Sequence, residues 1–321
     1  MKQINTLLLT NTHFDPTADQ LVALQKEFPM LKITLDASKT YEPHHLLDAE
    51  VVLGFPRTEE LKDAKSLKWL QTASSGIAQY VDRSLYANED VLLSNAVGTY
   101  GRAIADHVLG MVIGFNHQLF KYRDQMKQQL WQRYFPTKDL WDSTMLVIGF
   151  GDLGQSVARM AKAHSMRTIV VKRTATAKPD YVDHLYTTDE LDAVIGEADY
   201  LVICAASTDE TAHLIDQKRL GLMKKGSYLI NVSRGNIVDQ DALIAALENG
   251  HLGGAGLDVT TPEPLPADNP LWQMDNVMIS PHSSGLSVDC SDQIYELFKE
   301  NLRRYLARDR LKNQIDFDRG Y

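Results

Sequence analysis

Three side chains that could move a proton or hold an anion follow separate apolar runs in the second half of the chain. They are Arg234 after residues 228–230, Glu263 after 256–259 and His282 after 277–279. If these runs are parallel strands, their carboxyl ends meet at one edge of a sheet and bring the side chains together. Each residue alone has an ordinary structural explanation, such as a surface ion pair. Their convergence is what predicts a catalytic site.

The three groups suit the reduction of a 2-oxo acid. The guanidinium of Arg234 can hold a carboxylate and polarise the neighbouring ketone. The imidazole of His282 can give a proton to the developing alkoxide near neutral pH. A carboxylate such as Glu263, hydrogen-bonded to that ring, would favour the imidazolium and fix its orientation. The hydride would have to come from a nicotinamide cofactor.

The segment 144–164 has the pattern of a site for such a cofactor. Four apolar residues at 145–148 predict a buried strand, and an amphipathic helical pattern follows. Between them, Gly149 permits a tight turn, Gly151 lets a pyrophosphate approach the backbone, and Gly154 lets the helix pack closely on its strand. The amino end of the helix would face the phosphates, so the segment predicts dinucleotide binding.

Alternating strand-like and helical runs predict an α/β fold with two domains. Five short apolar runs in the first half lie at residues 7–9, 31–35, 51–53, 67–70 and 91–93. After residue 144, five further runs at 168–171, 200–203, 228–230, 256–259 and 277–279 alternate with helical segments such as 188–195 and 240–249, which predicts a parallel, doubly wound sheet. A last helix at about 287–306 is expected to return to the first domain. We therefore assign 1–99, completed by 286–321, to a substrate domain and 100–285 to a dinucleotide-binding domain.

Two further segments carry weaker predictions. The loop at 72–77 combines backbone amides with flanking hydroxyls and could hold a substrate carboxylate, although an ordinary turn fits equally well. A long helix is expected at 102–127. The segment 118–142 overlaps its end and is too aromatic for a solvated linker, which predicts contact with a partner subunit or the cleft. Its aromatic residues are Trp131, Tyr134, Phe135 and Trp141.

Composition narrows the class of protein. The 321 residues carry a formal charge of -9 and no basic run, which argues against nucleic acid or an anionic membrane surface as a partner. No apolar stretch is long enough for a signal peptide or a membrane span, so we expect a cytoplasmic protein. Cys204 and Cys290 lack the spacing of a metal site, and neither a metal nor a disulfide is expected.

The motifs together resemble the D-isomer-specific 2-hydroxyacid dehydrogenase family. They lie at residues 94–99, 105–109, 149–154, 231–239, 256–266 and 280–285. Asp106 stands where the family more often has glutamate. The resemblance implies a Rossmann-type doubly wound sheet for the coenzyme and a smaller flavodoxin-like α/β substrate domain. It also implies a homodimer built through the coenzyme domain.

The resemblance also implies roles for individual residues. Arg234 and His282 would bind substrate, with His282 as the acid/base and Glu263 orienting it. Asp258 would contact the nicotinamide amide. The amides of Ser75, Gly76 and Ile77 would hold the substrate carboxylate. Further cofactor contacts are expected at Gly149, Gly151, Asp152, Leu153, Gly154, Ala205, Thr208, Val232, Ser233, His282 and Gly285.

Two segments depart from the family pattern. NAD-using members carry an acidic residue at the end of the second coenzyme strand, where it receives the ribose hydroxyls. This chain has Lys172 there, followed by Arg173 and Thr174, and such cations can hold the 2'-phosphate of NADP. NADP is therefore the expected cofactor, with NAD still open. Residues 205–208 replace a stretch that often contains proline beside the nicotinamide ribose, which leaves that contact open.

The sequence thus predicts an NADPH-dependent reductase that makes D-2-hydroxy acids from small 2-oxo acids such as glyoxylate or hydroxypyruvate. One alternative is an NAD-dependent enzyme of the phosphoglycerate or branched-chain type. An alternative from another class is a dinucleotide-sensing binding protein, like the transcriptional corepressors that share this fold. Turnover of any 2-oxo acid would distinguish catalysis from sensing.

Overall fold

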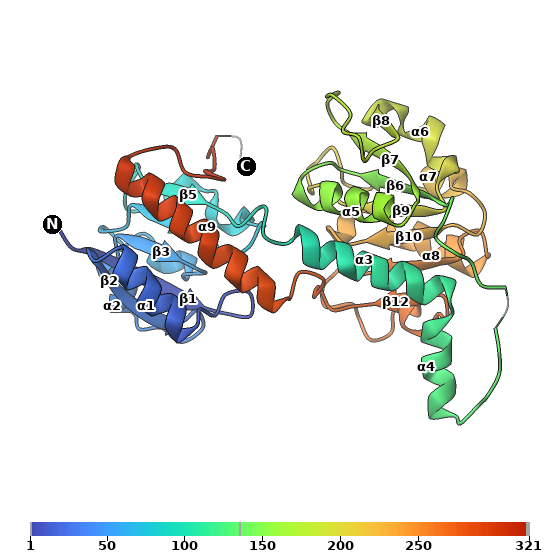
Figure 1. Ribbon diagram of the computed structural model, residues 1–321, viewed down its shortest axis with the longest axis horizontal. Helices are drawn as coiled ribbons and strands as arrows, with labels where there is room; N and C mark the ends of the chain where they lie inside the picture. The colour runs from blue at the N-terminus through green and yellow to red at the C-terminus, as the bar shows by residue number, and fades with distance from the viewer. Residues whose placement is uncertain (1, 135, 319–321) are drawn as a thin grey trace. The chain divides into compact units, whose positions relative to one another are not determined.

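The computed structural model describes residues 2–134 and 136–318 and divides into two compact α/β units (Figure 1). Unit 1 consists of Met1–Thr99 and Leu286–Tyr321, and unit 2 of Tyr100–Gly285. No helix within the described ranges is both long and apolar enough to cross a membrane. Phe135, one of the aromatic residues expected at an interface, lies outside the described residues.

Unit 1 contains a five-stranded parallel sheet in the order β2-β1-β3-β4-β5. Its strands are β1 (Ile4–Thr10), β2 (Leu31–Ala37), β3 (Val51–Leu53), β4 (Trp69–Gln71) and β5 (Leu92–Ser94). Its helices are α1 (Ala18–Glu27), α2 (Pro43–Asp48) and α9 (Val288–Ala307). The ring of Trp69 stacks on Phe298 and Tyr305 of α9, with centroid distances of 5.3 and 5.5 Å. The last helix therefore packs into the core of the unit that the amino-terminal residues begin.

Unit 2 contains a seven-stranded parallel sheet in the order β12-β11-β10-β9-β6-β7-β8. Its strands are β6 (Thr144–Ile148), β7 (Arg167–Lys172), β8 (His184–Thr187), β9 (Tyr200–Ile203), β10 (Tyr228–Asn231), β11 (Gly254–Leu257) and β12 (Val277–Ile279). Its helices are α3 (Gly101–Asn116), α4 (Leu119–Lys127), α5 (Asp152–Ala163), α6 (Leu191–Val194), α7 (Gln217–Leu222) and α8 (Gln240–Glu248). The strand order reverses between β6 and β9, and ligands of open α/β sheets bind at such a switch point.

Two apolar cores cover the two faces of the unit 2 sheet, because successive strand residues point to opposite sides. Along β6, Met145 and Val147 pack with α3 and α5, whereas Leu146 and Ile148 pack with α6, α7 and α8. All four side chains are at most 3% exposed. Burial on both faces explains why this strand is a continuous apolar run rather than an alternating one. The predicted α/β class with a doubly wound sheet is confirmed.

The predicted helix at 102–127 is wrong in one respect, because the structure divides it into α3 and α4. Gln118 has a left-handed backbone with φ of 56°, which ends one helix and begins the next. The ring of Phe120 then packs against Gly114, where a Cβ atom would lie 2.3 Å from it. The absence of a side chain at Gly114 permits this close contact. No proline or glycine marks the break itself, so the helical periodicity concealed it.

Three smaller predictions also differ from the structure. The edge strand β8 was missed because its side chains are only partly buried and give no apolar run. The strand expected at 256–259 is β11, which ends at Leu257, so Asp258 lies beyond the strand. The helix expected at 188–195 is one short α-helix, α6, between two turns of 3-10 helix.

Candidate functional site

The glycine-rich turn between β6 and α5 has the geometry that a pyrophosphate needs. Gly149 has φ of 92°, and a Cβ atom there would lie 2.6 Å from the backbone of Ala205. At Gly154 a Cβ atom would lie 1.9 Å from the carbonyl oxygen of Gly149, so only glycine lets α5 pack this closely on its strand. At Gly151, in contrast, a Cβ atom would meet nothing within 4 Å. The open side of the turn therefore faces away from the protein at the amino end of α5.

The expected cofactor residues around this turn lie at the carboxyl edge of the same sheet. Asp152 and Leu153 begin α5. Ala205 and Thr208 follow β9, whereas Val232 and Ser233 follow β10. The hydroxyl of Ser233 donates to the carbonyl of Ala205, which ties these two strand ends together. Gly285 ends unit 2, and a Cβ atom there would lie 2.9 Å from the ring of Tyr100.

The two cations at the end of β7 are accessible to an anion. The ammonium of Lys172 donates to Thr176 Oγ1 at 3.1 Å. Arg173 Nη1 lies 3.9 Å from Glu210 Oε2, and the two side chains are 65% and 74% exposed. An exposed pair at that separation contributes little, so the guanidinium can change partners. Thr174 follows on the surface.

Arg234 is held at the end of β10 by its neighbours. The buried side chain of Asn231 donates to the carbonyl of Arg234 at 2.9 Å and accepts from the amide of Ser233 at 3.1 Å. Gly235 follows, where a Cβ atom would lie 2.1 Å from the carbonyl oxygen of Thr260. The segment carrying Arg234 therefore lies directly against the segment that leads to Glu263. Its guanidinium has one donor bonded to the carbonyl of Ser233, at 2.8 Å.

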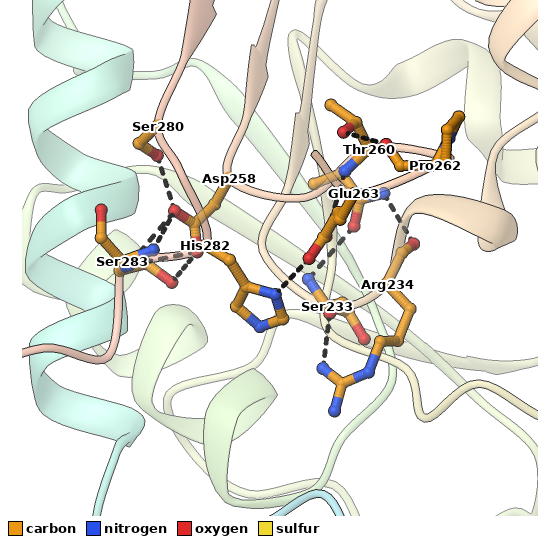
Figure 2. A network of polar contacts seen from close by, with 11 residues as sticks. Ser233, Arg234, Asp258, Thr260, Pro262, Glu263, Ser280, His282 and Ser283 are labelled. Atoms are coloured by element: carbon orange, nitrogen blue, oxygen red, sulfur yellow. Dashed lines mark hydrogen bonds and ion pairs between the residues drawn. The ribbon is translucent and has the colours of Figure 1, made fainter. Parts of the chain in front are cut away.

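His282 and Glu263 form a hydrogen-bonded pair (Figure 2). The distance from His282 Nδ1 to Glu263 Oε2 is 2.8 Å, and the two side chains are 47% and 40% exposed. The other carboxylate oxygen of Glu263 accepts from the amide of Thr260 at 3.3 Å. Since Glu263 occupies Nδ1, the remaining ring nitrogen of His282 is left to face a ligand.

These side chains line one open pocket of about 370 Å³. Its lining residues are Arg234, Gly235, Asn236, Thr260, Thr261, Pro262, Glu263 and His282. In Figure 2 the guanidinium of Arg234 lies on the same side of the network as the His282 ring. The structure thus brings together the arginine, the carboxylate and the imidazole that the sequence places after three different strands.

Asp258 lies behind His282 and is 1% exposed. Its carboxylate accepts hydrogen bonds from the hydroxyls of Ser280 and Ser284 and from the amides of Ser283 and Ser284. Burial acts to raise the pKa of Asp258, but hydrogen bonds from Ser280 and Ser284 hold it below its ordinary value. Asp258 is therefore a buried anion, and the loop that carries His282 packs around it.

Sequence reasoning missed two residues of this network. Asn231 orients the Arg234 segment, and His107 of α3 has its Nε2 atom 2.9 Å from the Ser280 hydroxyl. Asn231 ends β10, and its side chain bonds to the backbone two and three residues further along the chain, so it carries no reactive signal of its own. His107 lies within a helix, and its partner Ser280 is set by the packing of α3 on the sheet.

The loop expected to hold a substrate carboxylate follows β4 in unit 1. Its carbonyls are already bonded: Ser75 accepts from Asn95 at 3.2 Å, Gly76 from Ser74 at 2.7 Å, and Ile77 from Tyr80 at 2.7 Å. None of the three amides of Ser75, Gly76 and Ile77 donates to another residue in the described part of the chain. Unpaired amides on an ordered loop are suited to bind an anion.

A family model of the D-isomer specific 2-hydroxyacid dehydrogenase NAD binding domain matches residues 109–284. A glyoxylate reductase from Korarchaeum cryptofilum is 29% identical over 240 residues, which cover 70% of this chain and 71% of that protein. The segment that the family model matches contains the glycine turn, Arg234, Glu263 and His282.

Solved structures extend the similarity to the whole chain. A D-isomer specific 2-hydroxyacid dehydrogenase family protein from Aeromonas salmonicida has 31% identity and a TM-score of 0.87, covering 99% of this chain and 100% of that chain. A family member from Xanthobacter autotrophicus, in complex with NADPH and MES, has 26% identity and a TM-score of 0.80, with coverage of 99% and 100%. The chain therefore belongs to the D-isomer specific 2-hydroxyacid dehydrogenase family, whose members are NAD(P)-dependent oxidoreductases acting on CH–OH groups.

Proposed function

We propose that the protein uses NADPH to reduce a small 2-oxo acid, such as glyoxylate or hydroxypyruvate, to the D-2-hydroxy acid. The observation that carries this proposal is the pocket in which Arg234, Glu263 and His282 meet. Each group matches one requirement of the reaction, namely binding an anion, orienting a ring and transferring a proton. The glyoxylate reductase relative supports a small substrate.

Arg234 binds the substrate and polarises its ketone. A guanidinium has five N–H donors in a planar fork, and among the described residues only Nη1 of Arg234 finds a partner, the carbonyl of Ser233. The remaining donors can meet the ketone oxygen and one carboxylate oxygen together. This contact strengthens as negative charge develops on the ketone oxygen, so it lowers the barrier more than it tightens substrate binding.

His282 gives the proton to the developing alkoxide. Its Nδ1 donates to the carboxylate of Glu263, which leaves the proton on Nε2 for the substrate. After transfer, the neutral ring keeps the Nδ1 proton in the hydrogen bond to Glu263. The carboxylate therefore fixes both the tautomer and the direction of the ring.

The glycine turn and the end of β7 would hold the cofactor, which supplies the hydride when bound. Open space at Gly151 and the amino end of α5 fit a pyrophosphate. Lys172 and Arg173 at the end of β7 fit a 2'-phosphate, and the only anion that pairs with Arg173 among the described residues is the exposed Glu210. This charge pattern supports NADPH over NADH.

The unpaired amides of Ser75, Gly76 and Ile77 in unit 1 suit the carboxylate of a substrate. This assignment gives unit 1 the substrate role and unit 2 the coenzyme role. It supports a small acid, because the loop offers backbone donors to a carboxylate and no charged side chain of its own.

We also propose that a second copy of the chain covers the segment around α4. Large apolar side chains lie exposed there: Met126 at 71%, Leu130 at 51%, Trp131 at 97% and Trp141 at 75%. Isolated exposed hydrophobic residues are common, but four within one short segment are typical of an interface. The occupant is the same chain, as in the dimers that the family resemblance implies.

The test is a panel of 2-oxo acids assayed with NADPH and NADH in parallel. We expect turnover of glyoxylate or hydroxypyruvate, with a higher kcat/KM for NADPH. In Arg173→Ala, NADPH should weaken far more than NADH, because only NADPH carries the 2'-phosphate. Lys225→Ala is a matched control, since Lys225 precedes β10 at the opposite edge of the sheet. Equal weakening of the two cofactors in Arg173→Ala would remove the 2'-phosphate contact. No turnover of any acid would remove the proposed function.

A further inference from the structure

We propose that His107 and Ser280 are positioning residues that act through Asp258 to hold His282 in its reactive orientation. The inference rests on the proposed function, because it assumes that His282 transfers the proton. It is separate from the contact with the nicotinamide amide that the family resemblance implies for Asp258.

The loop that carries His282 is built around the buried carboxylate of Asp258. Asp258 Oδ1 accepts from the Ser280 hydroxyl at 2.6 Å and from the amide of Ser283 at 2.8 Å. The amide of His282 itself donates to the main-chain carbonyl of Asp258, also at 2.8 Å. One residue thus restrains the chain before, at and after the histidine, as Figure 2 shows.

Such restraint is needed because His282 has an unfavourable backbone conformation. Its φ is 51°, in the left-handed region that residues with a Cβ atom rarely adopt. A conformation of this kind persists only when the surrounding structure determines it. The ring direction of His282 follows from this backbone, so loosening the contacts to Asp258 would let the ring leave its hydrogen bond with Glu263.

His107 completes the network from α3. Asp258, as an anion, can only accept hydrogen bonds, so the single proton of the Ser280 hydroxyl is directed to it. The oxygen of Ser280 must then accept from His107, which fixes a proton on Nε2 of His107 at 2.9 Å. The direction of each hydrogen bond is determined, and the chain from His107 to Asp258 ties the catalytic loop to α3, a long helix packed on the sheet.

These bonds use most of the acceptor capacity of Asp258. Oδ1 accepts from Ser280, Ser283 and Ser284, and Oδ2 accepts from the amide and the hydroxyl of Ser284. A carboxylate has about four acceptor sites, and four donors reach this one, because the amide of Ser284 is shared between both oxygens. The carboxylate therefore acts on the loop of its own chain.

The test compares Ser280→Ala, His107→Leu and His107→Gln in the full-length protein. Ser280→Ala and His107→Leu break the chain of hydrogen bonds, whereas the amide of glutamine can still donate to Ser280. We expect kcat to fall on the order of 10²-fold in the first two variants, because a small misplacement of a catalytic group has that effect. NADPH affinity, measured by fluorescence titration, should stay within about threefold of the wild type. His107→Gln should recover most of the lost kcat.

A second readout needs no cofactor. In the ligand-free protein, hydrogen exchange at the amides of residues 282–284 should become at least tenfold faster in Ser280→Ala and His107→Leu, and little faster in His107→Gln. His117→Leu, at the exposed end of α3, is the matched control and should change neither kcat nor exchange. Thermal unfolding of each variant checks that unit 2 remains folded.

The outcomes separate this inference from the proposed function. Unchanged exchange and unchanged kcat in both Ser280→Ala and His107→Leu would overturn the positioning role. Weaker NADPH binding with normal kcat would also overturn it, because the cluster would then be a cofactor contact. Near-normal turnover in His282→Ala would instead remove His282 from the proposed mechanism, while the exchange measurement would still report on the loop.

Discussion

Gly154→Ala is expected to destabilise unit 2, by an amount that follows from the geometry of the turn. A Cβ atom at this position would lie 1.9 Å from the carbonyl oxygen of Gly149, about 1.4 Å short of the ordinary carbon–oxygen contact of about 3.3 Å. The clashing atom belongs to the backbone, so α5 itself must move away from β6. Overpacking of this kind costs about 3 kcal/mol, and the better helix propensity of alanine offsets about 1 kcal/mol.

The net loss of about 2 kcal/mol corresponds to a fall in Tm of about 4–8 °C for a unit of this size. Thermal unfolding followed by circular dichroism measures it. Gly151→Ala is the matched control, because its added Cβ meets no atom within 4 Å in the ligand-free protein. Its Tm should stay near the wild-type value, whereas its NADPH affinity should fall at least tenfold, about 1.4 kcal/mol. A Gly154→Ala protein as stable as the wild type, or a Gly151→Ala protein with normal NADPH affinity, would refute this account of the turn.

Three other variants test separate parts of the molecule. Arg234→Lys should lose most of its kcat/KM for the best 2-oxo acid, because a point charge cannot hold two oxygens in one plane; a largely active lysine variant would contradict bidentate binding. Trp131→Ser should shift the protein from dimer to monomer in sedimentation, whereas an unchanged mass would place the interface elsewhere. Asp258→Asn should lower the free energy of unfolding at pH 7. Since the folded pKa of Asp258 is depressed, its stabilisation is present above the unfolded value near 3.9 and is lost as pH falls through the folded value. The difference between wild type and variant in urea unfolding should therefore shrink towards pH 3, and a constant difference would argue against an ionised Asp258.

The positions of the strands were predictable where burial is complete. β6 and β9 are buried on both faces, so their sequences are unbroken apolar runs that no helix of that length would give. β8 escaped prediction because the edge of a sheet has one neighbour and partial exposure, which removes the apolar signal. The break between α3 and α4 escaped because a left-handed residue at Gln118 needs no special sequence when an aromatic ring and a glycine pack across it.

The candidate site was predictable for a different reason. Parallel strands deliver their carboxyl ends to one edge, so any reactive residue one to six positions after a strand becomes a neighbour of the others. Arg234, Glu263 and His282 all meet this condition, and the rule needs no knowledge of the packing. His107 does not, because it lies within a helix and reaches the site only through the hydroxyl of Ser280.

The reactive groups and the groups that orient them are specified in different ways. Sheet topology, which the periodicity of the sequence reveals, brings the reactive groups together. Tertiary packing, which the periodicity does not reveal, places the groups that orient them. Asp258 shows how the two combine: the family resemblance implies a contact with the nicotinamide amide, and the tertiary packing places serines from the loop after β12 on its carboxylate. A residue that follows a strand can therefore serve the site by holding a neighbouring loop in place, and its hydrogen-bond partners identify that role.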